Sequence, residues 1–161
     1  MRWSRWPGVP VRKSVVVKAP EDIAVLNAWL AGGHFERHRI SFAVRRSVLE
    51  IPFYRVERER RRMAGGIPLF RRYIVPVEEW LLHISHVKSF QVQPVHPDRR
   101  EGEDIINAIH YDADSQRIEI SSAFSRGIEV LVGKFEVELV DTGNVIRERV
   151  EGPLARFFYF N

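Results

Sequence analysis

Histidines are the side chains of this chain best suited to bind a metal or to move a proton, and it has six of them. His34 and His38 lie four residues apart, the spacing that places two ligands on one face of a helix. Glycines 32–33 end the helical pattern just before them, so we expect two polar side chains at a loop-to-strand junction. His83 and His86 lie three apart in an expected strand and would project to opposite faces. The histidine spacing therefore predicts no metal site.

No other local pattern indicates catalysis. The chain has no cysteine, which excludes a thiol nucleophile, a disulfide scaffold and a cysteine-ligated metal. None of its serines stands in a G-x-S-x-G turn, and there is neither a phosphate-binding P-loop nor a G-x-G-x-x-G sequence. We expect no catalytic residue and no cofactor. An enzyme or small-ligand binder stays an alternative, because a site can be assembled from residues without a local signature.

The strongest candidate for binding a partner is the arginine-rich stretch 55–62. Arginine pairs well with phosphates and carboxylates, but Glu57 and Glu59 lower the local potential and the stretch lacks aromatic residues for base stacking. We interpret it as a solvated loop or strand end, with a nucleic-acid interface and a protein-facing patch as alternatives. On this interpretation Arg60→Ala is nearly neutral, within about 0.5 kcal/mol. The candidate partner-binding residues are Arg55, Arg58, Arg60, Arg61, Arg62, Arg71 and Arg72.

Four consecutive aromatic residues near the C-terminus form a second candidate contact: Phe157, Phe158, Tyr159 and Phe160. We expect them to dock as a strand, because an exposed aromatic edge would be sticky. The alternative is a contact between copies of the chain.

Composition and charge fit one globular domain. The chain has 161 residues, 45% of them hydrophobic, and a net charge of +4. The charge is uneven: residues 1–75 hold 16 basic and 6 acidic side chains, whereas residues 76–161 hold 9 and 15. We interpret this as a basic half packed on an acidic half within one fold. The alternative is a basic face that meets an acidic protein or a polyanion.

The chain reads as one helix followed by many strands. Pro20, acidic residues in the first turn and the glycine stop predict a helix near 20–31. Pro52 indicates a sheet edge or a bulge, and Pro76 leaves a helix open as an alternative for residues 76–87. Loops or turns are expected at residues 96–104, 112–116, 125–127 and 142–144, and strands at residues 14–18, 40–44, 48–56, 69–75, 80–87, 90–95, 105–111, 117–124, 128–140 and 145–150.

Two segments match each other at a constant offset of 69 residues: 40–51 and 109–120. Isoleucine, an aromatic, an aliphatic, glutamate and isoleucine coincide, and both segments read as strand, turn, strand. We expect positions 40, 42, 49 and 51 and their counterparts 109, 111, 118 and 120 to face inward, with Glu50 and Glu119 outward. Ile120→Asp should then unfold the protein. Duplication of a hairpin unit, near 38–56 and 107–124, and convergence both stay open.

These observations predict a mainly β (α+β) single domain over residues 1–161, an antiparallel β-sandwich or partly open barrel with one N-terminal helix. No apolar stretch is long enough to span a bilayer, and the first residues do not resemble a signal peptide, so we expect a cytoplasmic protein. By exclusion, the expected function is non-catalytic: an interaction or accessory protein, for instance of the immunity type, that binds a protein partner or itself. Nucleic-acid binding through residues 55–62 is the alternative.

Overall fold

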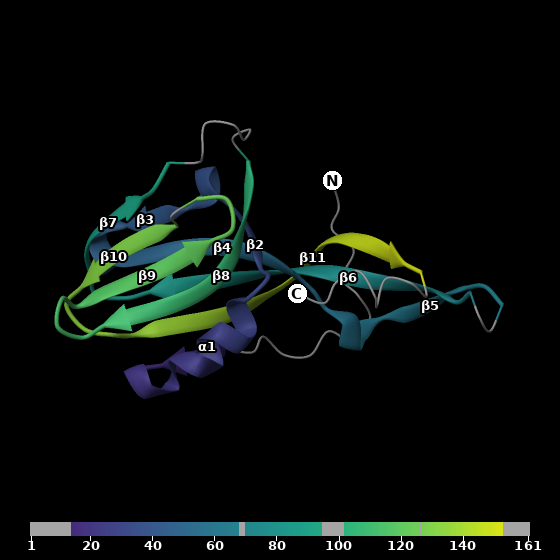
Figure 1. Ribbon diagram of the computed structural model, residues 1–161, viewed down its shortest axis with the longest axis horizontal. Helices are drawn as coiled ribbons and strands as arrows, with labels where there is room; N and C mark the ends of the chain where they lie inside the picture. Colours follow the sequence, from purple (N-terminus) through teal and green to yellow (C-terminus); the bar gives the residue numbers. More distant parts are fainter. Residues whose placement is uncertain (1–13, 68–69, 95–101, 126, 153–161) are drawn as a thin grey trace.

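The computed structural model describes residues 14–67, 70–94, 102–125 and 127–152. Within these ranges eleven antiparallel strands form one open sheet in the order β1-β11-β6-β4-β2-β8-β9-β10-β7, with β3 beside β4 and β5 beside β6 (Figure 1). The strands are β1 (Ser14–Val17), β2 (His34–Glu36), β3 (Ser41–Ala43), β4 (Val48–Val56), β5 (Arg62–Gly65), β6 (Arg72–Ile84), β7 (Val87–Val92), β8 (Glu103–Asp112), β9 (Arg117–Ser122), β10 (Ile128–Val132) and β11 (Val137–Glu151).

The mainly β, antiparallel fold with an N-terminal helix is confirmed, but the finer expectation of a sandwich or barrel is not shown. The described strands belong to one sheet whose path ends at β1 and β7, rather than to two stacked sheets. Short 3-10 turns connect several of them: η1 (Pro20–Asp22), η2 (Arg37–Arg39), η3 (Val44–Arg46) and η4 (Arg58–Arg60).

The predicted helix forms α1 (Ile23–Leu30), directly after η1. Leu26 and Leu30 are fully buried against the sheet, and Gly32 follows with φ +77°, the left-handed conformation that glycine adopts without strain. Within the described ranges, no helix is long and apolar enough to cross a membrane.

The end of α1 and the turn after it cover the edge of β8 where β2 stops pairing with it. Gly32 N–H donates to the Ile106 carbonyl and Ile106 N–H to the Gly33 carbonyl, both at 2.8 Å. One turn back on the helix, the Asn27 amide does the same for Ile109: Nδ2 donates to its carbonyl at 3.0 Å and Oδ1 accepts from its N–H at 2.7 Å. A side chain thus satisfies backbone groups that would otherwise lie unpaired.

The core lies between α1 and the curled sheet. Trp80, Leu82 and Ile84 share the inner face of β6, as the alternation predicts, and the helix alternative for residues 76–87 is wrong because β6 runs through Ile84. The sheet curls until β7 approaches β3: the Phe42 and Phe90 rings are 5.5 Å apart. Figure 1 shows β7 and β3 together at the end of the molecule opposite to β5.

The two segments that match at an offset of 69 form hairpins with the same register. Phe42 pairs with Leu49 in β3–β4, and Tyr111 pairs with Ile118 in β8–β9. The turn residues Ser47 and Gln116, also 69 apart, have φ of 51° and 53°.

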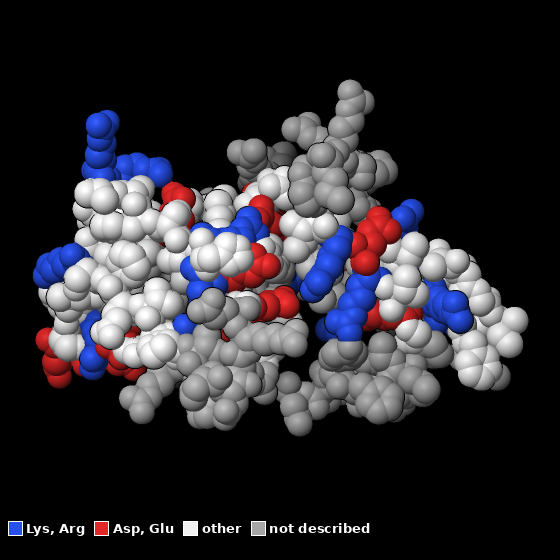
Figure 2. Space-filling model, turned by 90° about the horizontal axis from the view of Figure 1, so that it is seen from above, with Lys and Arg blue, Asp and Glu red and all other residues white. Residues whose placement is uncertain are grey.

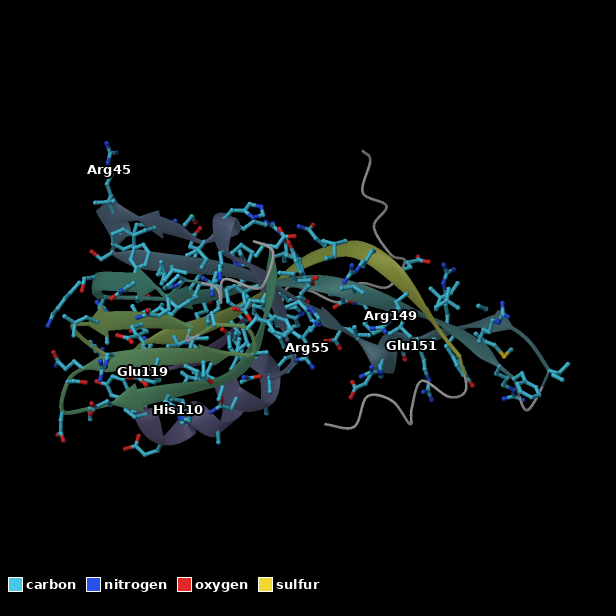
Figure 3. All side chains as sticks on the ribbon, turned by 45° about the horizontal axis from the view of Figure 1, so that its top comes forward. Arg45, Arg55, His110, Glu119, Arg149 and Glu151 are labelled. Carbon is cyan, nitrogen blue, oxygen red and sulfur yellow. The ribbon has the colours of Figure 1, made fainter. Side chains whose placement is uncertain are left out.

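Burial at the eight predicted inward positions agrees with the expectation. Those at 49, 51, 109, 118 and 120 are buried, and those at 40, 42 and 111 pack against the core in partly buried positions. Glu50 and Glu119 lie on the opposite face; His110 pairs with Glu119 on the outside of the body (Figure 3). Shared geometry is what both duplication and convergence produce, so the choice between them stays open.

The turn expected at residues 142–144 is wrong, because β11 continues through it as a bulge. Side chains supply the hydrogen bonds that the bulge needs: Thr142 Oγ1 donates to the Glu79 carbonyl at 2.7 Å, and Asp141 Oδ1 accepts from Gly143 N–H at 2.7 Å. The single strand expected over 128–140 is instead β10 and the start of β11, with the reversal between Val132 and Val137.

Residues 96–101 of the loop expected at 96–104 lie outside the described residues. The expectation that the loop extends to residue 104 is wrong. Glu103 and Asp104 begin β8, and Asp104 is buried. Five groups hydrogen-bond to its carboxylate, which explains how a charged residue from a polar stretch enters the interior.

Candidate functional site

All seven arginines predicted to bind a partner lie on one projection of the molecule or at its base. We call this projection the arm: residues 58–67, which hold η4 and β5, residues 70–77 with the start of β6, and residues 145–151 of β11. In Figure 1 the arm extends away from the curled part of the sheet, and in Figure 3 Arg55 lies at its base with Arg149 and Glu151 along it. The arm contributes no residue to the main hydrophobic core.

The arm exists because β6 and β11 are longer than their neighbours. β4 pairs with β6 only as far as Val77, and β5 pairs with the preceding residues of β6. Pro76 lies in the gap between these two partners, where a residue without an N–H breaks no ladder bond; its carbonyl accepts from Glu57 N–H at 2.9 Å. Pro52 lies in a similar gap of β4, between its pairings with β3 and β2. Both prolines therefore mark a change of partner strand.

Ion pairs within the chain occupy four of the seven arginines. Arg58 donates through two nitrogens to both oxygens of Glu151, at 3.2 and 3.3 Å, and Arg62 lies 3.2 Å from both oxygens of Glu148. Glu148 and Glu151 belong to β11, 86 to 93 residues away in sequence. The acidic half of the chain thus neutralises part of the basic half, as Figure 2 shows where blue and red atoms alternate over the arm.

Nearer the body, two carboxylates are paired with arginine in largely buried positions. Arg60 contacts Glu78, whose residue is only 4% exposed, and Arg55 Nε lies 2.7 Å from Glu57. Burial raises the pKa of Glu78 and of Glu57, and the neighbouring arginine acts against this in each case. The positive charges of Arg55 and Arg60 therefore favour the ionised forms of Glu57 and Glu78.

Arg55 also anchors the base of the arm to the helix. Its guanidinium lies 4.7 Å from the ring centre of Trp29 and donates to the Trp29 carbonyl at 2.9 Å. Trp29 in turn packs on Trp80 with ring centres 5.0 Å apart. Arg55 therefore has a structural role as well as a charge.

The remaining three arginines make no carboxylate contact among the described residues. Arg61 lies over the Tyr73 ring at 4.9 Å, while Arg71 and Arg72 are exposed next to the turn that joins β5 to β6. These three leave positive charge on the surface of the arm.

The end of the arm is apolar. Met63, Ile67 and Phe70 are 64%, 64% and 62% exposed, and Figure 2 shows uncharged surface there. The Phe70 N–H donates to the Ile67 carbonyl at 2.8 Å and closes the turn. Gly66 has φ +110°, and a Cβ on it would overlap the Phe70 carbonyl, so the turn requires glycine. Large exposed apolar side chains on a projecting turn are typical of an interaction site.

Comparison of the chain with protein-family models, with curated proteins and with solved structures finds no match. The arrangement of side chains therefore has to carry the functional argument.

A pocket of about 420 Å³ lies on the outer face of the sheet, beside the base of the arm, and no sequence pattern indicates it. Its lining includes Tyr54, Glu79 and Asn144, which register places side by side on β4, β6 and β11. Arg39 contacts the Tyr54 hydroxyl and lies 2.5 Å from Glu79, while Asn144 donates to Glu79 at 3.1 Å. Burial is the largest influence on Tyr54 and raises its pKa. These polar groups are bonded to one another.

The described histidines do not form a site. His34 lies 2.9 Å from Glu103, His38 is exposed in η2, and His86 lies in the turn after β6. Among the described residues no three potential metal ligands gather. The aromatic segment 157–160 lies outside the described residues, so that prediction stays untested.

The Asp104 cluster is a hydrogen-bond centre that no sequence pattern indicates. Its carboxylate accepts from the Ser122 and Ser125 hydroxyls at 2.8 Å each, from two backbone N–H groups and from Arg37 at 3.2 Å. Burial acts to raise the pKa of Asp104, but the hydrogen bonds outweigh it and the pKa is lowered. A carboxylate kept ionised and bonded on all sides joins β8 to the loop after β9, which is a structural role.

Proposed function

We propose that this chain is a non-catalytic cytoplasmic protein that binds another protein through the arm. The observation that carries the proposal is an exposed apolar turn, Met63, Ile67 and Phe70, on a projecting hairpin. Beside it lie arginines that make no carboxylate contact among the described residues. Apolar side chains and arginine are what protein interfaces concentrate, whereas a solvated turn has no need of them. An accessory protein of the immunity type would fit this description, by class alone.

The ion pairs of the arm favour a protein over a nucleic acid. A phosphate backbone would have to compete with Glu148 and Glu151 for Arg62 and Arg58, and it gains nothing from Met63 or Phe70. Nucleic-acid affinity grows with the number of arginines that are free to neutralise phosphates. Pairing four of the seven within the chain lowers that number.

A small-ligand function is the second candidate, and the pocket beside Tyr54 supports it. A ligand there would have to replace the bonds that Arg39, Glu79 and Asn144 already make. Losing satisfied, partly buried hydrogen bonds is costly, so this candidate ranks below the arm.

The finer fold proposal is that the curled part of the sheet is a partly open barrel. Two contacts support it: Phe42 with Phe90, and the Val87 N–H with the Ser47 carbonyl at 3.0 Å. They bridge β7 and the β3–β4 hairpin although these do not form a strand ladder.

The test of the binding function is site-specific photocrosslinking in cells that express the chain. A benzophenone amino acid replaces Phe70 in one version and Asp114, at the exposed β8–β9 turn, in the other. We expect protease-sensitive adducts at 70 and none at 114, and we expect Ile67→Ser to reduce them. Equal adducts at both positions, nuclease-sensitive adducts, or no adduct at 70 would overturn the proposal.

A further inference from the structure

We infer that the partner of the arm supplies an acidic, extended segment that pairs as an additional strand with β5, along the edge that no other described strand occupies. This inference rests on the proposed function and adds the chemistry and the backbone geometry of the bound segment.

The first observation is the open edge. β5 pairs with β6 through Arg62 with Ile74, Met63 with Tyr73 and Gly65 with Arg72, and all its residues are exposed. No other described strand pairs with β5. An uncovered edge presents N–H and C=O groups in the spacing that an incoming strand needs.

The second observation is that hydrogen bonds from other parts of the chain cover the edge of β8 in the same fold. Where β2 leaves β8, Gly32, Gly33 and the Asn27 side chain bond to the exposed backbone groups of Ile106 and Ile109. No described segment does this for β5, which lies at the far end of the molecule (Figure 1) and whose four residues are all exposed. The contrast points to β5 as an edge available for pairing.

The third observation is the charge around β5, which selects the occupant. The described residues 57–67 and 70–73 hold six arginines, and Glu78, Glu148 and Glu151 pair with three of them. The other three, at 61, 71 and 72, make no carboxylate contact among the described residues. Carboxylates on a strand bound beside β5 would be attracted by the positive charge of these guanidinium groups. A second copy of the chain pairing edge to edge would bring the same arginines together, and like charges on neighbouring strands are destabilising. The occupant is therefore an acidic segment of a different protein.

The short length of β5 limits what the edge alone can provide. Four residues offer few outward backbone groups, so an isolated strand should bind weakly, with a dissociation constant on the order of 0.1–1 mM. Contacts with Met63, Ile67 and Phe70 would raise the affinity of a whole partner.

The probe is a synthetic octapeptide of alternating glutamate and valine, added to the full-length, isotopically labelled chain at about 50 mM salt. We expect saturable amide shifts and about tenfold slower amide exchange within residues 62–65. Two matched peptides separate the contribution of backbone pairing from that of charge. The same sequence N-methylated at alternate residues keeps its charge but loses its ability to pair, and an alternating lysine–valine peptide keeps the pairing but reverses the charge; neither should bind.

A charge variant of the chain completes the test. Arg71→Glu with Arg72→Glu should weaken binding of the glutamate–valine peptide at least tenfold, whereas Arg45→Glu with Lys134→Glu, the same charge change at exposed positions of the body, should change it less than twofold. Arg45 lies at the opposite end of the molecule (Figure 3).

Several results would overturn the inference: no saturable binding at about 1 mM peptide, equal binding of the N-methylated or lysine peptide, or shifts that avoid residues 62–65. The two proposals fail separately. Crosslinks at Phe70 without peptide pairing at β5 would leave protein binding intact and remove only the strand-pairing mode. Loss of the crosslinks would remove the function itself.

Discussion

Replacing Arg60 with alanine tests whether the arginines of the arm neutralise buried carboxylates or only belong to a solvated loop. The Arg60 side chain is 27% exposed, but the side chain of its partner Glu78 is only 6% exposed. Removing the guanidinium leaves Glu78 among Glu57 and Asp141, which both raise its pKa, with Arg55 as the remaining cation. The sequence alone predicts a neutral change, so the structure reverses that expectation.

The magnitude follows from the burial of the pair. Breaking a fully buried ion pair costs roughly 3–5 kcal/mol, and breaking an exposed one roughly 0–1 kcal/mol. With one buried partner and one that reaches water, we expect Arg60→Ala to lower the free energy of unfolding by about 1.5–3 kcal/mol at neutral pH. Arg71→Ala, in an exposed position, should change it by less than about 0.5 kcal/mol.

The loss should depend on pH in a defined direction. Burial raises the folded-state pKa of Glu78 above the ordinary glutamate value of about 4.3, and losing Arg60 raises it further. A carboxyl whose pKa is raised on folding favours the folded state most when it is protonated, so its contribution falls as pH rises from the ordinary value through the folded one. The deficit of Arg60→Ala should therefore be largest at neutral pH and shrink as pH is lowered toward about 4.3.

Urea unfolding of the parent chain, Arg60→Ala, Glu78→Gln and the double variant, each at several pH values, measures these quantities. In the double variant Glu78→Gln removes the unpaired charge, so it should recover more than half of the loss. A deficit below about 0.5 kcal/mol at neutral pH, a deficit independent of pH, or no recovery would refute the reasoning.

Three further substitutions test the fold. Ile120→Asp places a charge where 1% of the residue is exposed, and should cost about 4 kcal/mol or more, seen as loss of cooperative unfolding by circular dichroism. Asn27→Ala should cost about 1–3 kcal/mol in urea and speed amide exchange at Ile109; unchanged exchange would contradict the capping role. The pKa of Asp104 is lowered, so its stabilisation is present above the ordinary aspartate value of about 3.9 and is lost as pH falls through the folded one. Asp104→Asn should therefore destabilise at neutral pH and match the parent chain in acid, and an equal difference at both would contradict it.

Local patterns predicted the elements whose bonds are local. Pro20, the acidic residues after it and the glycine pair define α1 within a few residues, because capping depends on neighbours in sequence. The inward-facing positions of the two matching hairpins also followed from the sequence, because alternate residues of a strand share one face and Phe42, Leu49, Tyr111 and Ile118 all pack toward the core.

Features that depend on distant partners were not predictable in this way. Thr142 and Gly143 look like a turn, yet the Glu79 carbonyl on the neighbouring strand holds this segment as a bulge. Asp104 lies in a polar stretch, and its burial depends on hydroxyls about 20 residues further along. Neither the position of Glu79 nor that of the serines is encoded near these residues, so their influence appears only when the strands are placed.

The uneven charge of the two halves of the chain also cannot be interpreted without the distant partners of its arginines. Arg58 and Arg62 belong to the basic half, but their carboxylates come from Glu151 and Glu148 at the end of the acidic half. Counting charged residues along the sequence therefore overstates the positive charge on the surface of the arm. Strand pairing brings the basic half and the acidic half of the chain together there. The arm is left with the positive charge next to the β5–β6 turn and with the apolar turn itself, which are the two features on which the proposed binding of a protein rests. That combination disfavours a uniform polyanion and favours a protein segment that carries carboxylates beside apolar side chains.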